Sequence, residues 1–255
     1  MLWKKSWLET RWRFLIGLVL LMLSAASTVY SYPQIVKLLP LVKDVDVSGA
    51  IGRRVIEQAE LMRTYRGYVW SQWFQQNMPQ MWTLFAALLG TGGLLSQSSG
   101  GGTLFTLSLP VSRRRLVAVR SGTGLVELLA LALVPSLLLP LLSPAVGQSY
   151  ALSDALVHGT CLFIVGSMFF SLTFLLSTVF GDVWRPPLIA LCVAFVIALA
   201  ERFSPAVSSM GCLRLMSAED FFRGNGVPWL GLLVTGAVSV GLLYVADRNI
   251  ARRDF

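Results

Sequence analysis

The stretch GTLFTLSLPVSRRR, residues 102–115, lies between two long apolar segments and decides how the chain is oriented in a membrane. From Leu94 to Val126 there is no acidic residue, yet the segment holds four arginines: Arg113, Arg114, Arg115 and Arg120. Lys and Arg are concentrated in loops that remain in the cytoplasm, so both flanking spans should have their nearer ends on the cytoplasmic side.

The same stretch has the pattern of two helices separated by a break. Apolar and small residues lead up to a proline: Thr103, Leu104, Leu107, Leu109 and Pro110. Ser112 follows and can cap the N-terminus of a helix that runs into the next apolar span. This arrangement on the cytoplasmic face would let a soluble partner push on two membrane helices at once.

The composition is that of a membrane protein. Of the 255 residues 55% are hydrophobic and 13% are charged, whereas soluble domains average about 25% charged residues. A helix needs about 20 mostly apolar residues to cross about 30 Å of hydrocarbon. Six segments meet that requirement: 14–32, 79–97, 122–143, 155–180, 186–200 and 229–246. We therefore expect an all-α membrane protein with six transmembrane helices in a single domain over residues 1–255.

The distribution of charge predicts that both termini face the cytoplasm. With that orientation the inner segments hold 12 of the 21 basic residues and 4 of the 13 acidic residues, and the outer segments hold 9 basic and 8 acidic residues. The net charge of +8 therefore resides on the cytoplasmic side, where it suits orientation and anionic lipid. No nucleic-acid partner is expected.

Residues 1–13 are predicted to form an interfacial helix. Trp3, Trp7 and Phe14 fall on one helical face, and Lys5 lies opposite. The alternative is a signal peptide, with the small residues 24–27 as its cleavage site. Because apolar character returns after that site, we expect the segment to be retained.

Two outer segments are more than simple turns. Residues 34–78 form the longest polar segment, with an amphipathic helix predicted around Ala59. Its end is rich in aromatic residues, which we interpret as a belt at the lipid headgroups rather than a ligand-stacking site: Tyr65, Tyr68, Trp70, Trp73 and Phe74. Residues 203–228 are too apolar for a free loop and too interrupted for a span, so we expect a re-entrant or interfacial segment.

The sequence contains no motif for catalysis or nucleotide binding. The four lysines are not preceded by glycine, so there is no Walker A motif, and the glycines at 90–102 are expected to serve close helix packing. His158 is the only histidine, which excludes a His-Glu-x-x-His zinc site. We expect it to be a polar residue at the membrane interface. Cys161, Cys192 and Cys212 give an odd count and no disulfide framework, so they are expected to be small packing residues.

Glu127 is the one acidic residue inside a predicted span. Carboxylates within a membrane are costly, so a role in coupling or in a substrate pathway is one interpretation. The other is pairing with Arg120, two helical turns away, or reaching toward the cytoplasmic surface.

The chain resembles permease subunits of the ABC-2 type, the exporter membrane domains that have six spans and an ATPase on a separate chain. The resemblance is carried by Gly-Thr-Leu at 102–104, by residues 107–114 and by Arg120, ten residues after Pro110. The six-span layout, the interfacial helix and the basic residues near the end of the chain also fit. Family members place glutamates before the Gly-Thr; here residues 97–101 read QSSGG, so an acid-mediated contact is not expected.

The resemblance implies a permease subunit in a bacterial-type inner membrane, driven by a P-loop ATPase that holds the ATP and Mg, with no cofactor in this chain. It implies a second permease chain, identical or paralogous, and a cytoplasmic coupling segment at 98–115. The coupling residues it implies are Gly102, Thr103, Leu104, Leu107, Leu109, Pro110, Val111, Ser112, Arg113 and Arg114. A membrane scaffold or signalling anchor is the alternative function. An intramembrane enzyme is disfavoured by the missing motifs, and the sequence does not identify a substrate.

Overall fold

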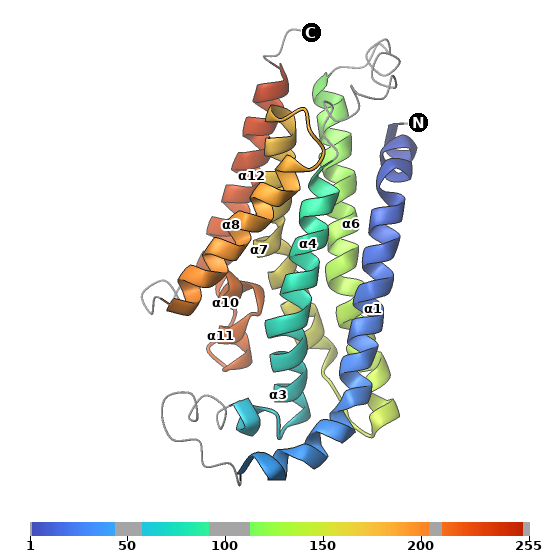
Figure 1. Ribbon diagram of the computed structural model, residues 1–255, viewed down its shortest axis with the longest axis vertical. Coiled ribbons are helices and arrows are strands. Elements are labelled where there is room, and N and C mark those ends of the chain that lie inside the picture. Colours follow the sequence, from blue (N-terminus) through green and yellow to red (C-terminus); the bar gives the residue numbers. More distant parts are fainter. Residues whose placement is uncertain (1, 44–57, 92–112, 204–210, 252–255) are drawn as a thin grey trace.

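The computed structural model describes residues 2–43, 58–91, 113–203 and 211–251. All regular elements within these ranges are helices (Figure 1). In chain order they are α1 (Leu2–Lys43), α3 (Tyr65–Val69), the π-helix η1 (Trp70–Asn77), α4 (Met78–Gly90), α6 (Arg113–Leu142), the 3₁₀ helix η3 (Ser143–Val146), α7 (Leu152–Val179), α8 (Arg185–Phe203), α10 (Cys212–Met216), α11 (Glu219–Phe222) and α12 (Trp229–Ala251).

Among the described residues, five helices are long and apolar enough to cross a membrane. The first is Leu2–Lys37 of α1, and the second is Arg114–Val146, which combines α6 with η3. The other three are α7, α8 and α12. This supports the expectation of an all-α membrane protein. The second predicted span, 79–97, is not among the five, because α4 has only 13 residues and ends at Gly90. Residues 92–97 lie outside the described part of the chain.

A helix that includes α4 begins well before the predicted span. The three elements α3, η1 and α4 follow one another without a gap from Tyr65 to Gly90. Trp70, Trp73 and Phe74 within this run are at most 2% exposed and belong to the hydrophobic core. The expectation of an aromatic belt at the headgroups is therefore wrong for these residues. Trp70 stacks on Phe222 of α11 and Phe74 stacks on His158 of α7, a tertiary burial that composition alone does not reveal.

α1 joins the predicted interfacial helix and the first predicted span into one helix of 42 residues. At about 1.5 Å per residue it is about 63 Å long, twice what a crossing of about 30 Å needs. Ser6 and Thr10 are buried, whereas Trp3 and Trp12 are exposed. Ser6 and Thr10 therefore face other helices, whereas the Trp3 ring, although largely exposed, still lies against Gly122 of α6.

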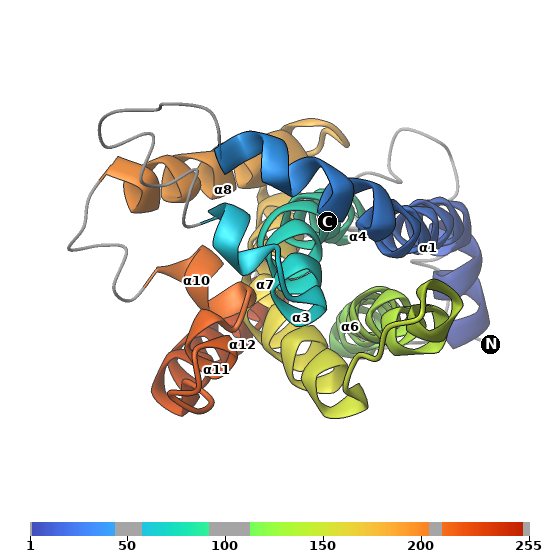
Figure 2. The same ribbon diagram turned by 90° about the horizontal axis from the view of Figure 1, so that it is seen from below.

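α7 lies at the centre of the bundle, in contact with α12, α6, α4 and α8 (Figure 2). Close packing here depends on glycine. A Cβ added at Gly166 of α7 would collide with the ring of Trp82 on α4. A Cβ at Gly90 would lie 2.7 Å from Cβ of Thr173, which confirms the packing role expected for Gly90.

α1 begins and α12 ends at the same end of the bundle, which we call the terminal end (Figure 1). The turn from α7 to α8 also lies there, whereas the turn from α6 to α7 lies at the opposite, far end. The far-end turn is closed by Gly147 in the left-handed conformation, with φ of 70°.

Candidate functional site at the terminal end

Three helices meet in a polar cluster at the terminal end, formed by Glu9, Thr10 and Arg13 of α1, Thr91 after α4, and Arg120 and Glu127 of α6. Arg13 supplies the contact with α4. Its Nη1 donates to the carbonyl oxygen of Leu88 at 3.0 Å and also to the Thr91 hydroxyl. The last carbonyls of a helix lack partners within the helix, so the guanidinium stabilises the end of α4.

Two further contacts join α1 to α6. Arg120 Nη2 lies 2.9 Å from Oε2 of Glu9, and the Thr10 hydroxyl donates to Oε1 of Glu127 at 2.5 Å. The Arg120 side chain is 16% exposed and Glu9 is 28% exposed, so this ion pair is partly shielded from solvent. The expected pairing of Arg120 with Glu127 is wrong, because each group has its partner on α1, which packs along α6.

Glu127 is 4% exposed, and its Oε2 has no hydrogen-bond partner within the described part of the chain. It lies fourteen residues into α6, about 21 Å from the start of that helix. Thr10 also has carbonyl oxygens of its own helix within reach, at Ser6 and Trp7. The Glu127 carboxylate is thus held by a single hydrogen bond, and its donor, Thr10, can donate to a carbonyl of its own helix instead.

A fourth helix contacts the start of α6 more weakly. Arg114 Nε lies 3.7 Å from Oδ2 of Asp247 on α12, and the arginine side chain is 70% exposed. An exposed pair of this kind contributes about 0–1 kcal/mol, so it orients α6 more than it stabilises the fold.

The structure brings together the two ends that flank the predicted coupling segment. α4 ends just before residue 92, and α6 begins at Arg113, directly after Ser112. Gly102, Thr103, Leu104, Leu107, Leu109, Pro110, Val111 and Ser112 lie outside the described residues. The polar cluster joins both flanking helix ends to α1.

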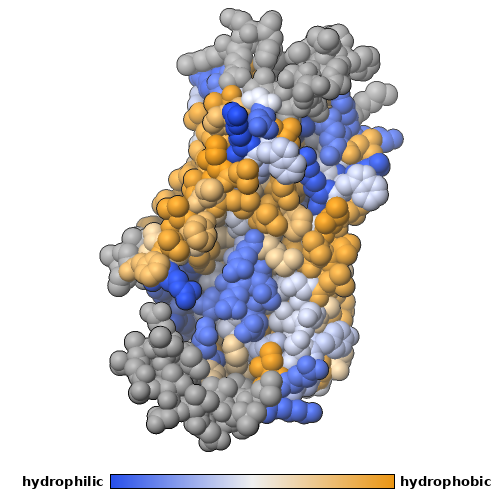
Figure 3. Space-filling model, viewed as in Figure 1, coloured by the Kyte–Doolittle hydropathy of each residue, from blue (hydrophilic) through white to orange (hydrophobic). Residues whose placement is uncertain are grey.

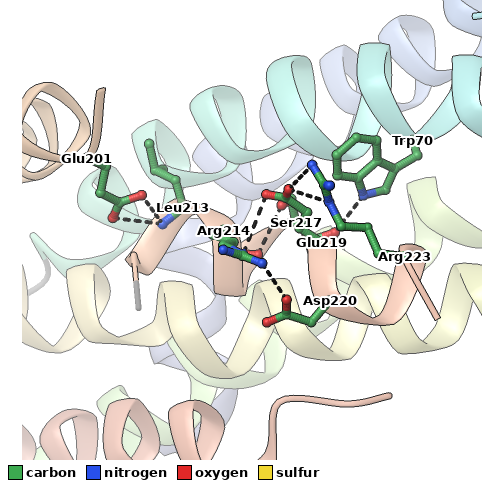
Figure 4. A network of polar contacts seen from close by, with 8 residues as sticks. All are labelled: Trp70, Glu201, Leu213, Arg214, Ser217, Glu219, Asp220 and Arg223. Carbon is green, nitrogen blue, oxygen red and sulfur yellow. Dashed lines mark hydrogen bonds and ion pairs between the residues drawn. The ribbon is translucent and has the colours of Figure 1, made fainter. Parts of the chain in front are cut away.

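A second polar network, beside the end of α8, fixes the described part of the segment predicted as re-entrant (Figure 4). Arg214 contacts Asp220 at 2.7 Å and Glu219 at 3.7 Å, and Arg223 contacts Glu219 at 2.6 Å. From α8, Glu201 accepts two hydrogen bonds of 3.1 Å from the backbone N–H of Leu213 at the start of α10. These contacts form α10 and α11 into a compact unit against α8. Re-entry into the membrane stays a prediction.

His158 connects this unit to the centre of the bundle. It is fully buried on α7, stacks on Phe74 with ring centroids 4.5 Å apart, and has Nδ1 2.9 Å from the carbonyl oxygen of Ser217. A carbonyl only accepts, so Nδ1 carries the proton. Trp70 Nε1 donates to the same carbonyl at 3.1 Å. The expectation that His158 is an interface residue is therefore wrong, because the α10–α11 segment covers it.

The described residues contain no group of three or more His, Cys, Asp or Glu that could hold a metal ion. All three cysteines are free: Cys161 is buried, Cys192 is exposed and Cys212 is partly buried. Buried Cys161 fits the expected packing role, whereas exposed Cys192 does not.

The sequence analysis missed a strip of amides on η1 and α4, formed by Gln72, Gln75, Gln76, Asn77 and Gln80. Gln75, Gln76 and Gln80 are exposed, and Gln72 and Asn77 are partly exposed. A hydrophilic patch lies at the corresponding place in the lower middle of the view in Figure 3, with apolar surface beside it. The spacing of 72, 75, 76 and 80 is helical, but these positions straddle the boundary between the predicted outer segment 34–78 and the predicted span 79–97.

No family model matches this chain, and no curated protein or solved structure matches it either.

Proposed function

We propose that this chain is the permease subunit of an ATP-driven exporter of the ABC-2 type, powered by a P-loop ATPase on a separate chain. The observation that carries the proposal is the joining of the ends of α4 and α6 to α1 by Arg13, Arg120 and Glu127. Residues 102–115, which resemble the family motif, are thereby attached to a rigid three-helix unit. A push on this segment would move α1, α4 and α6 together.

In this proposal the continuous helix from Tyr65 to Gly90 is the second of six spans. At about 1.5 Å per residue its 26 residues extend about 39 Å, which is enough for the hydrocarbon layer. α1 begins and α12 ends at the same end of the bundle (Figure 1), as an even number of crossings would require. In this proposal the terminal end faces the cytoplasm. Arg11, Arg13, Arg114, Arg120 and Arg185 are at that end, in keeping with orientation by basic residues.

Two measurements on the full chain in native membranes test the proposal. First, the chain should copurify with a P-loop ATPase and bind no ATP alone. Second, Leu107→Asp should leave the chain inserted but remove the response of ATP hydrolysis to substrate, because an aspartate would disrupt an apolar contact with the ATPase. Val47→Asp, in the predicted outer loop, is the matched control and should behave as wild type.

Replacing Arg113 and Arg114 together by Ala should weaken recovery of the ATPase more than insertion, since ten of the 12 inner basic residues remain to set orientation. Wild-type recovery and stimulation in both the leucine and the arginine variants would contradict the proposal. A membrane scaffold or signalling anchor, with a basic loop that serves orientation alone, would then be the better interpretation.

A further inference from the structure

We infer that the amide strip of η1 and α4 is the face by which two copies of this chain pair within the membrane. The inference deepens the proposed function by naming where the second permease chain docks. It rests on that proposal for its role in transport, but the pairing itself is tested separately. Its starting point is the exposure of Gln75, Gln76 and Gln80.

The strip lies at a depth where lipid surrounds the protein. Counting about 1.5 Å per residue from Tyr65, Gln72 lies about 10 Å and Gln80 about 22 Å along a rod of about 39 Å. These positions fall within the hydrocarbon layer of about 30 Å if the helix from Tyr65 to Gly90 crosses it. Lipid chains offer no hydrogen bonds, so exposed amides at this depth require protein or water as partners.

The described part of the chain provides no such partner. None of the five side-chain amides forms a hydrogen bond within it. In Figures 1 and 2 the strip-bearing helix lies between α1 and α8, on the side of α7 away from α12. Figure 3 shows apolar surface beside the hydrophilic patch, and α8 has exposed apolar residues, including Val193, Val196 and Leu199. A partner chain would therefore meet a polar strip with an apolar border.

A second copy is the occupant that fits this chemistry. Each amide carries both donors and an acceptor, so a row of amides is complementary to itself. A two-fold axis places the same patch on both partners, and this patch has no charge that would repel its copy. Interhelical hydrogen bonds between Gln and Asn side chains are a known means of joining membrane helices.

Disulfide cross-linking tests the pairing directly. In a full-length background without the three native cysteines, Gln76→Cys and Gln80→Cys are compared with Val234→Cys and Val238→Cys, exposed positions on α12. Oxidation in membranes should give at least about tenfold more homodimer from the strip positions, because a fixed interface raises the effective concentration of the two thiols. Equal or lower cross-linking than at the α12 positions would overturn the inference.

Leucine substitution gives a second test that does not depend on cysteines. Replacing Gln75, Gln76 and Gln80 together by Leu should convert pairs to single chains, counted by photobleaching steps of a fluorescent fusion. Val234→Leu with Val238→Leu is the matched control and should keep the wild-type count. If the strip faced lipid, the triple leucine variant would keep that count, and this result would refute the inference.

The two proposals fail in different ways. Strip cross-linking without recovery of any ATPase would support the pairing and contradict the transporter. Recovery of the ATPase with single copies of the chain, or with pairing through another face, would support the transporter and contradict the pairing. Cross-linking of the strip to a different membrane chain alone would also overturn the pairing of two copies.

Discussion

Arg120 of α6 forms an ion pair with Glu9 of α1, with 2.9 Å between Nη2 and Oε2, although 111 positions separate the two residues in the sequence. The pair sits among Arg13, Thr10 and Glu127 at the terminal end. It joins α1 to α6, and the Arg120 side chain is the more shielded of the two partners, at 16% exposed against 28% for Glu9. The orientation of α1 against the start of α6 depends on it.

Reversing either charge of this pair should destabilise the protein. Arg120→Glu places two carboxylates together, and we expect a loss between about 1 and 4 kcal/mol, between the values for exposed and buried pairs. The double variant Glu9→Arg with Arg120→Glu should recover at least half of that loss, because the pair is restored with exchanged partners. Thermal unfolding in detergent measures both. Equal loss in the single and double variants would mean that the two side chains do not interact.

A second prediction concerns Glu127. Glu127→Leu should leave insertion and thermal stability unchanged or raised, because a buried carboxylate is costly and Thr10 can donate to the Ser6 carbonyl instead. It should reduce substrate-stimulated hydrolysis by about tenfold, equivalent to about 1.4 kcal/mol of coupling. Glu127→Gln keeps an acceptor for Thr10, so its substrate-stimulated hydrolysis should lie between that of the wild type and that of Glu127→Leu. A destabilised leucine variant with normal stimulation would assign the residue a purely structural role. Val126→Leu, on an exposed neighbour, is the control.

Local sequence signals predicted the helices that are apolar along their length. The start of α8 beside the paired prolines 186–187 follows from the preference of proline for the first helical turn. The expected cap at Ser112 lies outside the described residues and stays a prediction. The helix from Tyr65 was missed because its apolar residues are aromatic, its exposed face is amide-rich and its middle is a π-helix. The aromatic and amide residues lower the hydropathy average. The π-helix disturbs the 3.6-residue period.

The hydrogen-bond and ion-pair partners of the polar residues could not be predicted from the sequence, for a different reason. Arg120 had a carboxylate within its own helix at Glu127, and proximity along the chain favoured that choice. The packing of α1 against α6 placed Glu9 nearer to Arg120 and Thr10 nearer to Glu127. Contacts of this kind depend on which helices are neighbours, which no local pattern encodes.

Trp70 gives a third prediction because its position in the core contradicts a headgroup belt. Its ring stacks on Phe222 with centroids 4.3 Å apart, and its Nε1 donates to the Ser217 carbonyl. Trp70→Ala should cost about 3–5 kcal/mol of stability, as expected for a buried tryptophan. Trp184→Ala is the control, since Trp184 is 69% exposed, and it should change stability by less than about 0.5 kcal/mol. Similar effects of the two substitutions on detergent unfolding would argue for a belt after all.

Glycine packing gives a fourth prediction with a matched control. Gly166→Ala should destabilise by about 1–3 kcal/mol, because its methyl group would collide with the Trp82 ring in the bundle centre. Gly241→Ala on α12 adds the same methyl group where nothing lies within 4 Å, and should be neutral or stabilising by up to about 1 kcal/mol. Both are measured by thermal unfolding in detergent. If Gly166→Ala is as stable as Gly241→Ala, α4 and α7 are farther apart than described.

The last prediction is the orientation, which the charge distribution and the shared end of the termini both favour. Single cysteines are introduced into a background without Cys161, Cys192 and Cys212, and are labelled with a reagent that does not cross membranes. A cysteine at Val47 should be labelled in intact cells, whereas one at Ser112 should be labelled only after permeabilisation. If Arg113, Arg114 and Arg115 set the orientation, their joint replacement by Glu should make some of the Ser112 cysteine accessible to the reagent in intact cells. Labelling at Ser112 in intact cells of the unaltered chain would reverse the assignment of the terminal end and remove the ATPase from reach of residues 102–115.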